Sequence, residues 1–163
     1  MRVWTLTQEL LQDDEFMEKY TKAASRFLPL HIAFLYSGDK LISVASNTCA
    51  YGHAERNCIK HIRYISPKTH RPMKLVVVRI DKQGVQGMSR PCYDCCIMLK
   101  HLLPRARVFY TGYGGMMCEE CHMDNSHYSL ARRNKEYQRG NNLRMCECDC
   151  YVPPTRWTRA NMC

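Results

Sequence analysis

Long hydrophobic runs are missing from this chain of 163 residues. Its longest apolar stretches have the length of a strand, well below the roughly 20 residues that a membrane-spanning helix needs. The N-terminus also lacks a basic start followed by a sustained apolar segment, so no signal peptide is expected. We therefore expect a soluble intracellular protein with no membrane partner, in the cytoplasm or the nucleus, and by size a single domain.

Acidic side chains are scarce relative to basic ones. The chain has 15 Asp and Glu against 24 Lys and Arg, which gives a formal charge of +9. The basic excess lies downstream, where residues 131–163 hold seven Lys or Arg and three Asp or Glu. Such charge could attract a nucleotide phosphate or a nucleic-acid backbone, because Lys and Arg neutralise phosphates whatever the sequence. Ordinary solubility explains the same composition.

Cysteine, by contrast, is abundant, with 11 residues. A secreted disulfide scaffold is disfavoured for three reasons: the count is odd, no export signal is evident, and one pair has the CxxC spacing of a metal site. We therefore expect reduced thiols, some of which bind a metal ion.

Two short segments carry the chemistry: an HAE tripeptide at 53–55 and a PCYDC segment at 91–95. His53, Cys92 and Cys95 are nitrogen and sulfur ligands of the kind that zinc takes in a catalytic site, where the fourth tetrahedral position stays open. Glu55 could reach a water at that position but is poorly placed to bind the same ion, so its natural role is general acid and base. Either segment alone is a weak signal, because a CxxC pair can also be redox-active or structural.

Both segments fit the starts of helices. Apolar residues three or four apart predict a helix over 53–65, entered at Gly52. Pro91 suits the first position of a second helix, which would place both CxxC sulfurs on one face beside a positive helix terminus. Cys96 would point about 100° away from Cys95 around that helix, so we interpret it as buried filler.

The rest of the pattern predicts the order helix, hairpin, helix, strand, helix, strand. The expected ranges outside the two motif helices are 14–27 for the first helix, 31–36 and 41–45 for the hairpin, 75–80 for a buried strand, 81–90 for a loop and 106–111 for the last strand.

An HxE followed by PCxxC resembles the zinc-dependent cytidine and deoxycytidylate deaminase superfamily, over roughly residues 15–130. The resemblance implies a three-layer α/β/α sandwich with a central mixed five-stranded sheet. Residues 1–130 would form the deaminase-like catalytic domain, and residues 131–163 a basic, Cys-rich C-terminal extension. Because the family is usually dimeric or larger, a homo-oligomer is also implied.

In that family the histidine and both cysteines hold one zinc ion and the glutamate moves protons, which assigns these roles to the four residues named above. The implied reaction converts cytidine, deoxycytidine or dCMP to the uracil form and releases ammonia. Substrate contacts are implied for Asn47, Ala54 and Ser89. Asn47 follows a strand at the place from which family members contact the sugar, although an asparagine after a strand is also a common turn residue.

A tight hairpin is predicted at Gly112-Tyr113-Gly114-Gly115, which would make a fifth strand antiparallel to the strand at 106–111. Within the family, that arrangement is more typical of enzymes that act on free nucleosides. Enzymes that act on tRNA or single-stranded DNA usually have a helical crossover there.

A second cluster of potential metal ligands follows the hairpin. Structural zinc takes four closed ligands, so two from each of two cysteine groups could tie the C-terminal segment to the domain. Free cysteines on a flexible tail are the alternative. The candidate ligands are Cys118, Cys121, His122, Cys146, Cys148 and Cys150.

Two other functions remain open. A nucleic-acid editing deaminase, acting on cytosine or adenine in DNA or RNA, would fit the basic downstream half and would bind oligonucleotides with steep salt dependence. A catalytically silent, zinc-stabilised binding protein would also fit the ligands, but it has no use for Glu55. The motif does not choose the target base, because both deaminations use the same metal and carboxylate.

Overall fold

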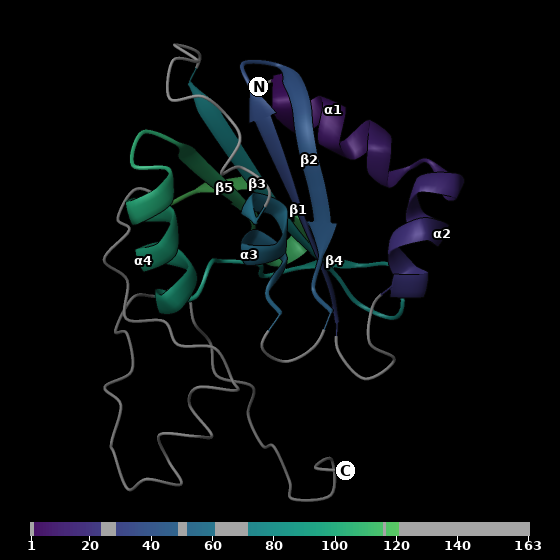
Figure 1. Cartoon of the computed structure of the whole chain (residues 1–163). Helices are drawn as coiled ribbons and strands as arrows, with labels where there is room; N and C mark the ends of the chain where they lie inside the picture. The colour runs from purple at the N-terminus through teal and green to yellow at the C-terminus, as the bar shows by residue number, and fades with distance from the viewer. Residues whose placement is uncertain (1, 24–28, 49–51, 61–71, 116, 121–163) are drawn as a thin grey trace, which may run out of the picture.

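The computed structural model describes residues 2–23, 29–48, 52–60, 72–115 and 117–120. These residues form a mixed α/β fold with four α-helices and one six-stranded sheet (Figure 1). The elements are α1 (Arg2–Leu11), α2 (Asp14–Ala23), β1 (Leu30–Ser37), β2 (Lys40–Ser46), α3 (Ala54–Ile59), β3 (Met73–Ile80), β4 (Gln86–Gly87), α4 (Tyr93–Leu102), β5 (Arg107–Thr111), the 3-10 turn η2 (Tyr113–Gly115) and β6 (Met117–Glu119).

The sheet is open and mixed, with the strand order β2-β1-β3-β5-β6 and with β4 paired to β3. The β3–β5 pair is parallel and the other pairs are antiparallel. Parallel neighbours need a long crossover, which α4 provides between β3 and β5. The β1–β2 hairpin expected from the sequence is confirmed, and Gly38 takes a positive φ of 61° in its turn.

The second predicted hairpin is also confirmed. Thr111 of β5 lies opposite Met117 of β6, and the two strands are antiparallel. Between them, Gly114 and Gly115 have φ values of 69° and 75°, a left-handed conformation that glycine adopts without steric cost. The double glycine is thus what allows the chain to reverse there.

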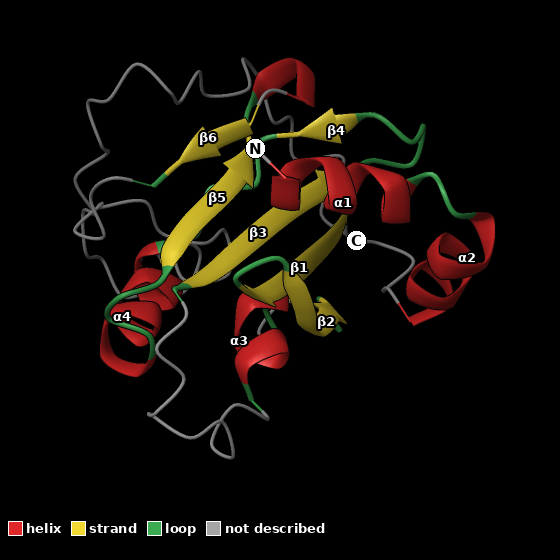
Figure 2. Cartoon of the chain, turned by 90° about the horizontal axis from the view of Figure 1, so that it is seen from above, coloured by secondary structure: helices red, strands yellow, loops and turns green. Residues whose placement is uncertain are grey.

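Helices pack on both faces of the sheet (Figures 1 and 2). On one face, Phe34, Val76 and their neighbours are buried against apolar side chains of α1 and α2. On the other face, Leu35 and Val77 pack with buried residues of α3 and α4. Strand β3 is therefore covered on both sides, which explains why Leu75–Val78 is a continuous apolar run rather than an alternating one.

Local chemistry sets the ends of α2 as the sequence predicts. The carboxylate of Asp13 accepts a 2.8 Å hydrogen bond from the backbone N–H of Phe16, which satisfies a donor that the first turn leaves unpaired. Acidic Asp14 and Glu15 lie in the first turn of the helix, and basic Lys22 lies in its last turn. The negative charges face the positive end of the helix dipole and the positive charge faces its negative end, and both placements are stabilising. The predicted continuation over 24–27 lies outside the described residues.

Three local expectations were incomplete or wrong. Helix α1 has no counterpart in the expected order, and β4 falls within the segment 81–90 that was expected to be a loop. A carboxylate oxygen of Asp81 accepts hydrogen bonds from the N–H groups of Gln83 and Val85, and this tight turn brings β4 back onto β3. Helix α4 begins at Tyr93 with Cys92 as its N-cap, so Pro91 lies before the cap rather than at the first helical position.

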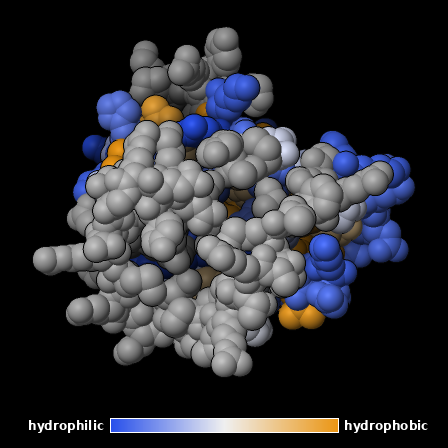
Figure 3. All heavy atoms as spheres, turned by 90° about the horizontal axis from the view of Figure 1, so that it is seen from below, coloured by the Kyte–Doolittle hydropathy of each residue, from blue (hydrophilic) through white to orange (hydrophobic). Residues whose placement is uncertain are grey.

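None of the described helices has the length and apolar character needed to cross a membrane. On the face of the molecule shown in Figure 3, described hydrophobic atoms are scattered among hydrophilic ones rather than gathered in one patch. The exposed large hydrophobic side chains of the described residues likewise come from four different parts of the chain, two of them from α4: Ile42, Val85, Ile97, Leu102 and Tyr113.

Candidate metal centre

The three predicted ligands meet at the N-termini of α3 and α4, two helices that lie side by side on the same face of the sheet. His53 is the N-cap of α3 and Cys92 is the N-cap of α4. Cys95 is the third residue of α4, and a helix brings the side chains at its N-cap and third positions together. The CxxC spacing therefore follows from helix geometry once Cys92 takes the capping position.

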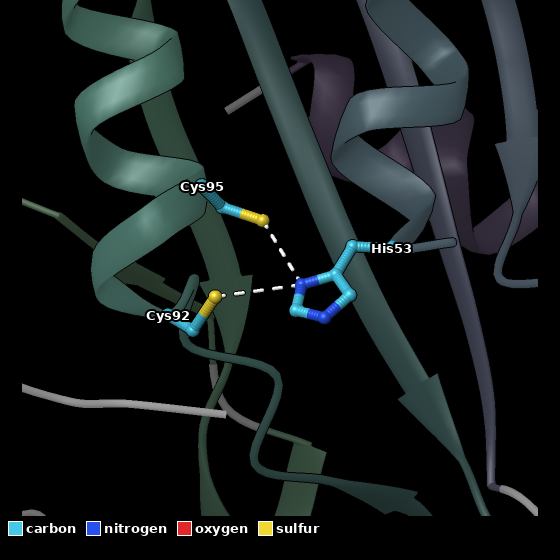
Figure 4. A group of neighbouring side chains, drawn as sticks. All are labelled: His53, Cys92 and Cys95. Carbon is cyan, nitrogen blue, oxygen red and sulfur yellow. Dashed lines mark hydrogen bonds between the residues drawn. The ribbon is translucent and has the colours of Figure 1, made fainter. Parts of the chain in front are cut away.

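One ring nitrogen of His53 faces both sulfurs (Figure 4). Its Nδ1 atom lies 3.1 Å from Sγ of Cys95 and 3.4 Å from Sγ of Cys92. A tetrahedral zinc with ordinary bond lengths separates a nitrogen and a sulfur ligand by about 3.6 Å. All three ligand atoms lie within 4.8 Å of one another, so small side-chain rotations would let them hold a metal ion such as zinc.

The two thiols are electrostatically unequal. The pKa of Cys92 is lowered to about 4, chiefly because its sulfur accepts a hydrogen bond from Cys95, with His53 contributing further. The same hydrogen bond and burial raise the pKa of Cys95. Cys92 in turn raises the pKa of His53 by hydrogen bonding to it. The group therefore already favours a thiolate at Cys92, and a bound cation would also favour deprotonation of Cys95.

Glu55 lies in the first turn of α3 beside this group, and its side chain is only 5% exposed. Burial raises the pKa of its carboxyl, and a hydrogen bond from its own backbone N–H is the largest effect that opposes that shift. A carboxyl whose charged form is disfavoured in this way holds a proton more readily than a solvated one. The predicted acid and base therefore has a suitable environment within reach of the ligands.

The three residues expected to contact substrate are all buried. The side-chain amide of Asn47 accepts a 2.8 Å hydrogen bond from the N–H of His31 and donates one of 3.2 Å to the carbonyl of Pro29. It thereby ties the end of β2 to the start of β1, whatever else it contacts. Ala54 is fully buried at the start of α3, within the cluster that α3 and α4 form with the sheet.

Ser89 has a clear structural role. Its hydroxyl donates a 2.7 Å hydrogen bond to the carbonyl of Val77 and accepts one of 2.8 Å from the N–H of Thr111. These contacts tie the segment before the PCYDC motif to both parallel strands, β3 and β5. The predicted contact of Ser89 with a substrate base stays a prediction, as does the sugar contact of Asn47.

Sequence reasoning missed two basic residues on the face of the sheet that packs against α3 and α4. His31 and Arg79 pair across β1 and β3, and side chains alternate along strands. Because Ala33 and Val77, two positions away, pack towards α3 and α4, His31 and Arg79 lie on that same face. Burial, then the charges of Arg79 and His53, lower the pKa of His31 to about 4. The phase of the alternation was the signal that could have revealed this pair.

Of the six candidate ligands for the predicted second zinc site, Cys118 alone lies in the described part of the chain. Cys118 lies in β6 opposite Tyr110 and packs, partly buried, against the cluster beneath α3 and α4. Cys96, expected to be filler, is fully buried, and its thiol donates to the carbonyl of Pro91 at 3.7 Å. The other candidate ligands, Cys121, His122, Cys146, Cys148 and Cys150, lie outside the described residues.

Neither a protein-family model nor a curated protein sequence matches the chain. What the described residues establish is a group of one histidine and two cysteines that could hold a metal ion, placed on a mixed α/β fold.

Proposed function

We propose that the chain is a zinc-dependent deaminase of the cytidine and deoxycytidylate type, which converts a free cytosine nucleoside or nucleotide to its uracil form. The observation that carries the proposal is the placement of a buried glutamate beside a three-ligand metal site. Glu55 is not needed to hold the ion, and its burial costs free energy. A carboxylate kept there in spite of that cost is best explained by proton transfer.

In this proposal His53, Cys92 and Cys95 hold zinc, which supplies the Lewis acidity that makes water a nucleophile at neutral pH. Glu55 would take a proton from the attacking water and deliver it to the ring nitrogen next to the amino-bearing carbon, while the water oxygen forms a bond to that carbon. Glu55 would then take the remaining proton from the new hydroxyl group and pass it to the amino group, so that the C–N bond breaks, ammonia leaves and the carbonyl of uracil forms. The balance is one water consumed and one ammonia released for each cytosine converted to uracil.

The arrangement of the described elements supports the same proposal. Helices α1 and α2 on one face and α3 and α4 on the other agree with the three-layer α/β/α sandwich that the motif implies. The sheet has an additional two-residue strand, β4, beyond the five strands that such a fold requires. The antiparallel β5–β6 pair favours a free nucleoside or nucleotide over tRNA or single-stranded DNA as substrate.

Arg79 favours a substrate that carries a phosphate, whereas His31, with its pKa lowered to about 4, is neutral near pH 7. Among the described residues no ion pair joins Arg79 to a carboxylate, and its Nε atom is buried without a hydrogen-bond partner. An arginine on the metal-site face whose charge is not neutralised by a neighbouring acid attracts an anionic ligand. Of the three candidate substrates, dCMP has that charge.

Ammonia release from a panel of substrates tests the proposal. Zinc-loaded protein is incubated with cytidine, deoxycytidine, dCMP and a single-stranded oligonucleotide containing cytosine, with Glu55→Gln as the inactive control. Release from a free nucleoside or nucleotide, abolished in Glu55→Gln, is the expected result. Release only from the oligonucleotide would assign the chain to nucleic-acid editing. Zinc binding without ammonia from any substrate would overturn the deaminase proposal and leave a silent binding protein.

A further inference from the structure

A buried ion pair joins the ligand segment, which is residues 89–92 before α4, to the residue that follows β6. Nε of Arg90 lies 2.6 Å from Oε2 of Glu120, and Nη2 lies 3.1 Å from Oε1. The two side chains are 15% and 2% exposed. A two-pronged guanidinium–carboxylate contact of this kind fixes orientation as well as distance, because both groups are planar.

The two partners occupy informative positions. Arg90 is two residues before the ligand Cys92, with only Pro91 between them. Glu120 directly follows β6, and its backbone N–H donates a 2.8 Å hydrogen bond to the carbonyl of Val108 in β5. The carboxylate is therefore held by the β5–β6 pair, and the arginine carries that placement to the segment that presents Cys92.

The neighbouring contacts show how closely this segment is held. Ser89 is bound to β3 and β5 through its hydroxyl and, through its N–H, to the carbonyl of Thr111 at 2.8 Å. On the other side of Arg90, the carbonyl of Pro91 accepts a hydrogen bond from the thiol of Cys96 in α4. Between these two anchors, the Arg90 side chain makes a contact that joins the segment to Glu120, the residue after β6.

We propose that the Arg90–Glu120 pair is a positioning pair for the metal centre: it holds Cys92 at the ligand geometry and makes metal affinity depend on β6. The inference rests on the metal site of the proposed function but not on the reaction. Partners that orient metal ligands typically change metal affinity by roughly 10- to 100-fold when they are removed. We expect Glu120→Gln to weaken zinc binding by that factor.

The chain offers a matched control one residue away. Glu119 forms a two-pronged pair with Arg107, with both contacts at 2.7 Å, but this pair is more exposed and joins β6 to β5. Glu119→Gln removes the same charge from the same strand end. It should leave zinc affinity within a few-fold of the unmodified protein, because exposed pairs contribute little.

The experiment measures zinc dissociation constants by competition with a chelator for the unmodified protein, Glu120→Gln, Glu119→Gln and Arg90→Lys. Cobalt substitution gives a second readout, because the thiolate-to-cobalt absorption reports the ligand geometry. The expected result is a loss of about 10-fold or more for Glu120→Gln, a smaller loss for Arg90→Lys, and an unchanged constant for Glu119→Gln.

Equal constants for Glu120→Gln and Glu119→Gln would overturn the proposal, whether both are weakened or neither is. Urea unfolding in chelator shows whether each variant folds without metal. If Glu120→Gln does not fold, Glu120→Asp keeps the charge at a shorter reach and is judged by the same comparison. Because ammonia release is not measured, an absence of deaminase activity would leave this test unaffected.

Discussion

The Nδ1 atom of His53 lies 3.1 Å from Sγ of Cys95, although the two residues are 42 positions apart in the chain. Each belongs to the opening of a helix, and the two helices pack on the same face of the sheet. The contact is thus a product of tertiary structure: the fold brings two helix N-termini together, and the motif residues occupy the positions that face each other.

Substitution of a ligand should remove one metal ion. We expect Cys95→Ser to lower zinc content by about one equivalent per chain, because a hydroxyl replaces the thiolate that binds zinc. Cys96→Ala is the matched control, because Cys96 is the next residue and is equally buried, but its thiol donates a hydrogen bond to the carbonyl of Pro91. Elemental analysis after dialysis measures both. Equal zinc loss in the control would mean that general destabilisation, not ligation, explains the effect.

Glu55→Gln should separate activity from stability. The amide keeps the shape of the carboxyl but cannot carry protons, so we expect ammonia release to fall by about 10²- to 10⁴-fold. Burial raises the pKa of Glu55, so a neutral amide is accommodated at less cost than the carboxylate, and the free energy of unfolding should stay the same or rise. Activity and urea unfolding on one preparation test both parts. A variant that loses activity only because it has lost zinc would contradict the proton-transfer role.

Much of the fold follows from local patterns, and so does the ligand group. The apolar run at Leu75–Val78 predicts a strand covered on both faces, and the double glycine predicts the reversal before β6. Zinc ligation constrains residue type and spacing so strongly that His53 and the CxxC pair can be recognised without knowledge of the fold.

Other features depend on contacts that spacing does not encode. Strand β4 forms because the Asp81 carboxylate organises a tight turn before it. The residue composition of 81–90 indicated only a loop and did not reveal this side-chain effect. The pairing of Arg90 with Glu120 depends on where β6 ends relative to the PCYDC segment. The roles expected of Asn47 and Ser89 came from their place in the chain, whereas their hydrogen bonds connect segments to neighbouring strands and could be seen only in three dimensions.

Asn47→Ala should destabilise the fold directly. Its side chain satisfies the backbone N–H of His31 and the carbonyl of Pro29, and alanine would leave both groups without that partner. An unsatisfied buried backbone group costs about 1–3 kcal/mol, so we expect the free energy of unfolding to fall by that amount. Urea unfolding in the presence of chelator measures it. An unchanged unfolding free energy would show that water replaces the amide, and a raised KM alone would then favour the sugar-binding role.

His31 should make the fold sensitive to mild acid. Its pKa is about 4 in the folded chain, below the ordinary value of 6.5, because burial and the charges of Arg79 and His53 disfavour its charged form. Between these values the unfolded chain binds more protons than the folded one, so the free energy of unfolding must decrease as the pH falls from 6.5 towards 4. The full effect of this one group is at most about 3 kcal/mol.

The test compares urea unfolding of the unmodified protein and His31→Gln from pH 7 to pH 4.5, both in chelator so that metal binding does not contribute. We expect the variant to lose less stability over this range, because glutamine has no proton to gain. His101→Gln is the control, since His101 is exposed in the last turn of α4. Parallel pH profiles for the unmodified protein and His31→Gln would mean that His31 is protonated in the fold as readily as in the unfolded chain, contrary to its position beside Arg79.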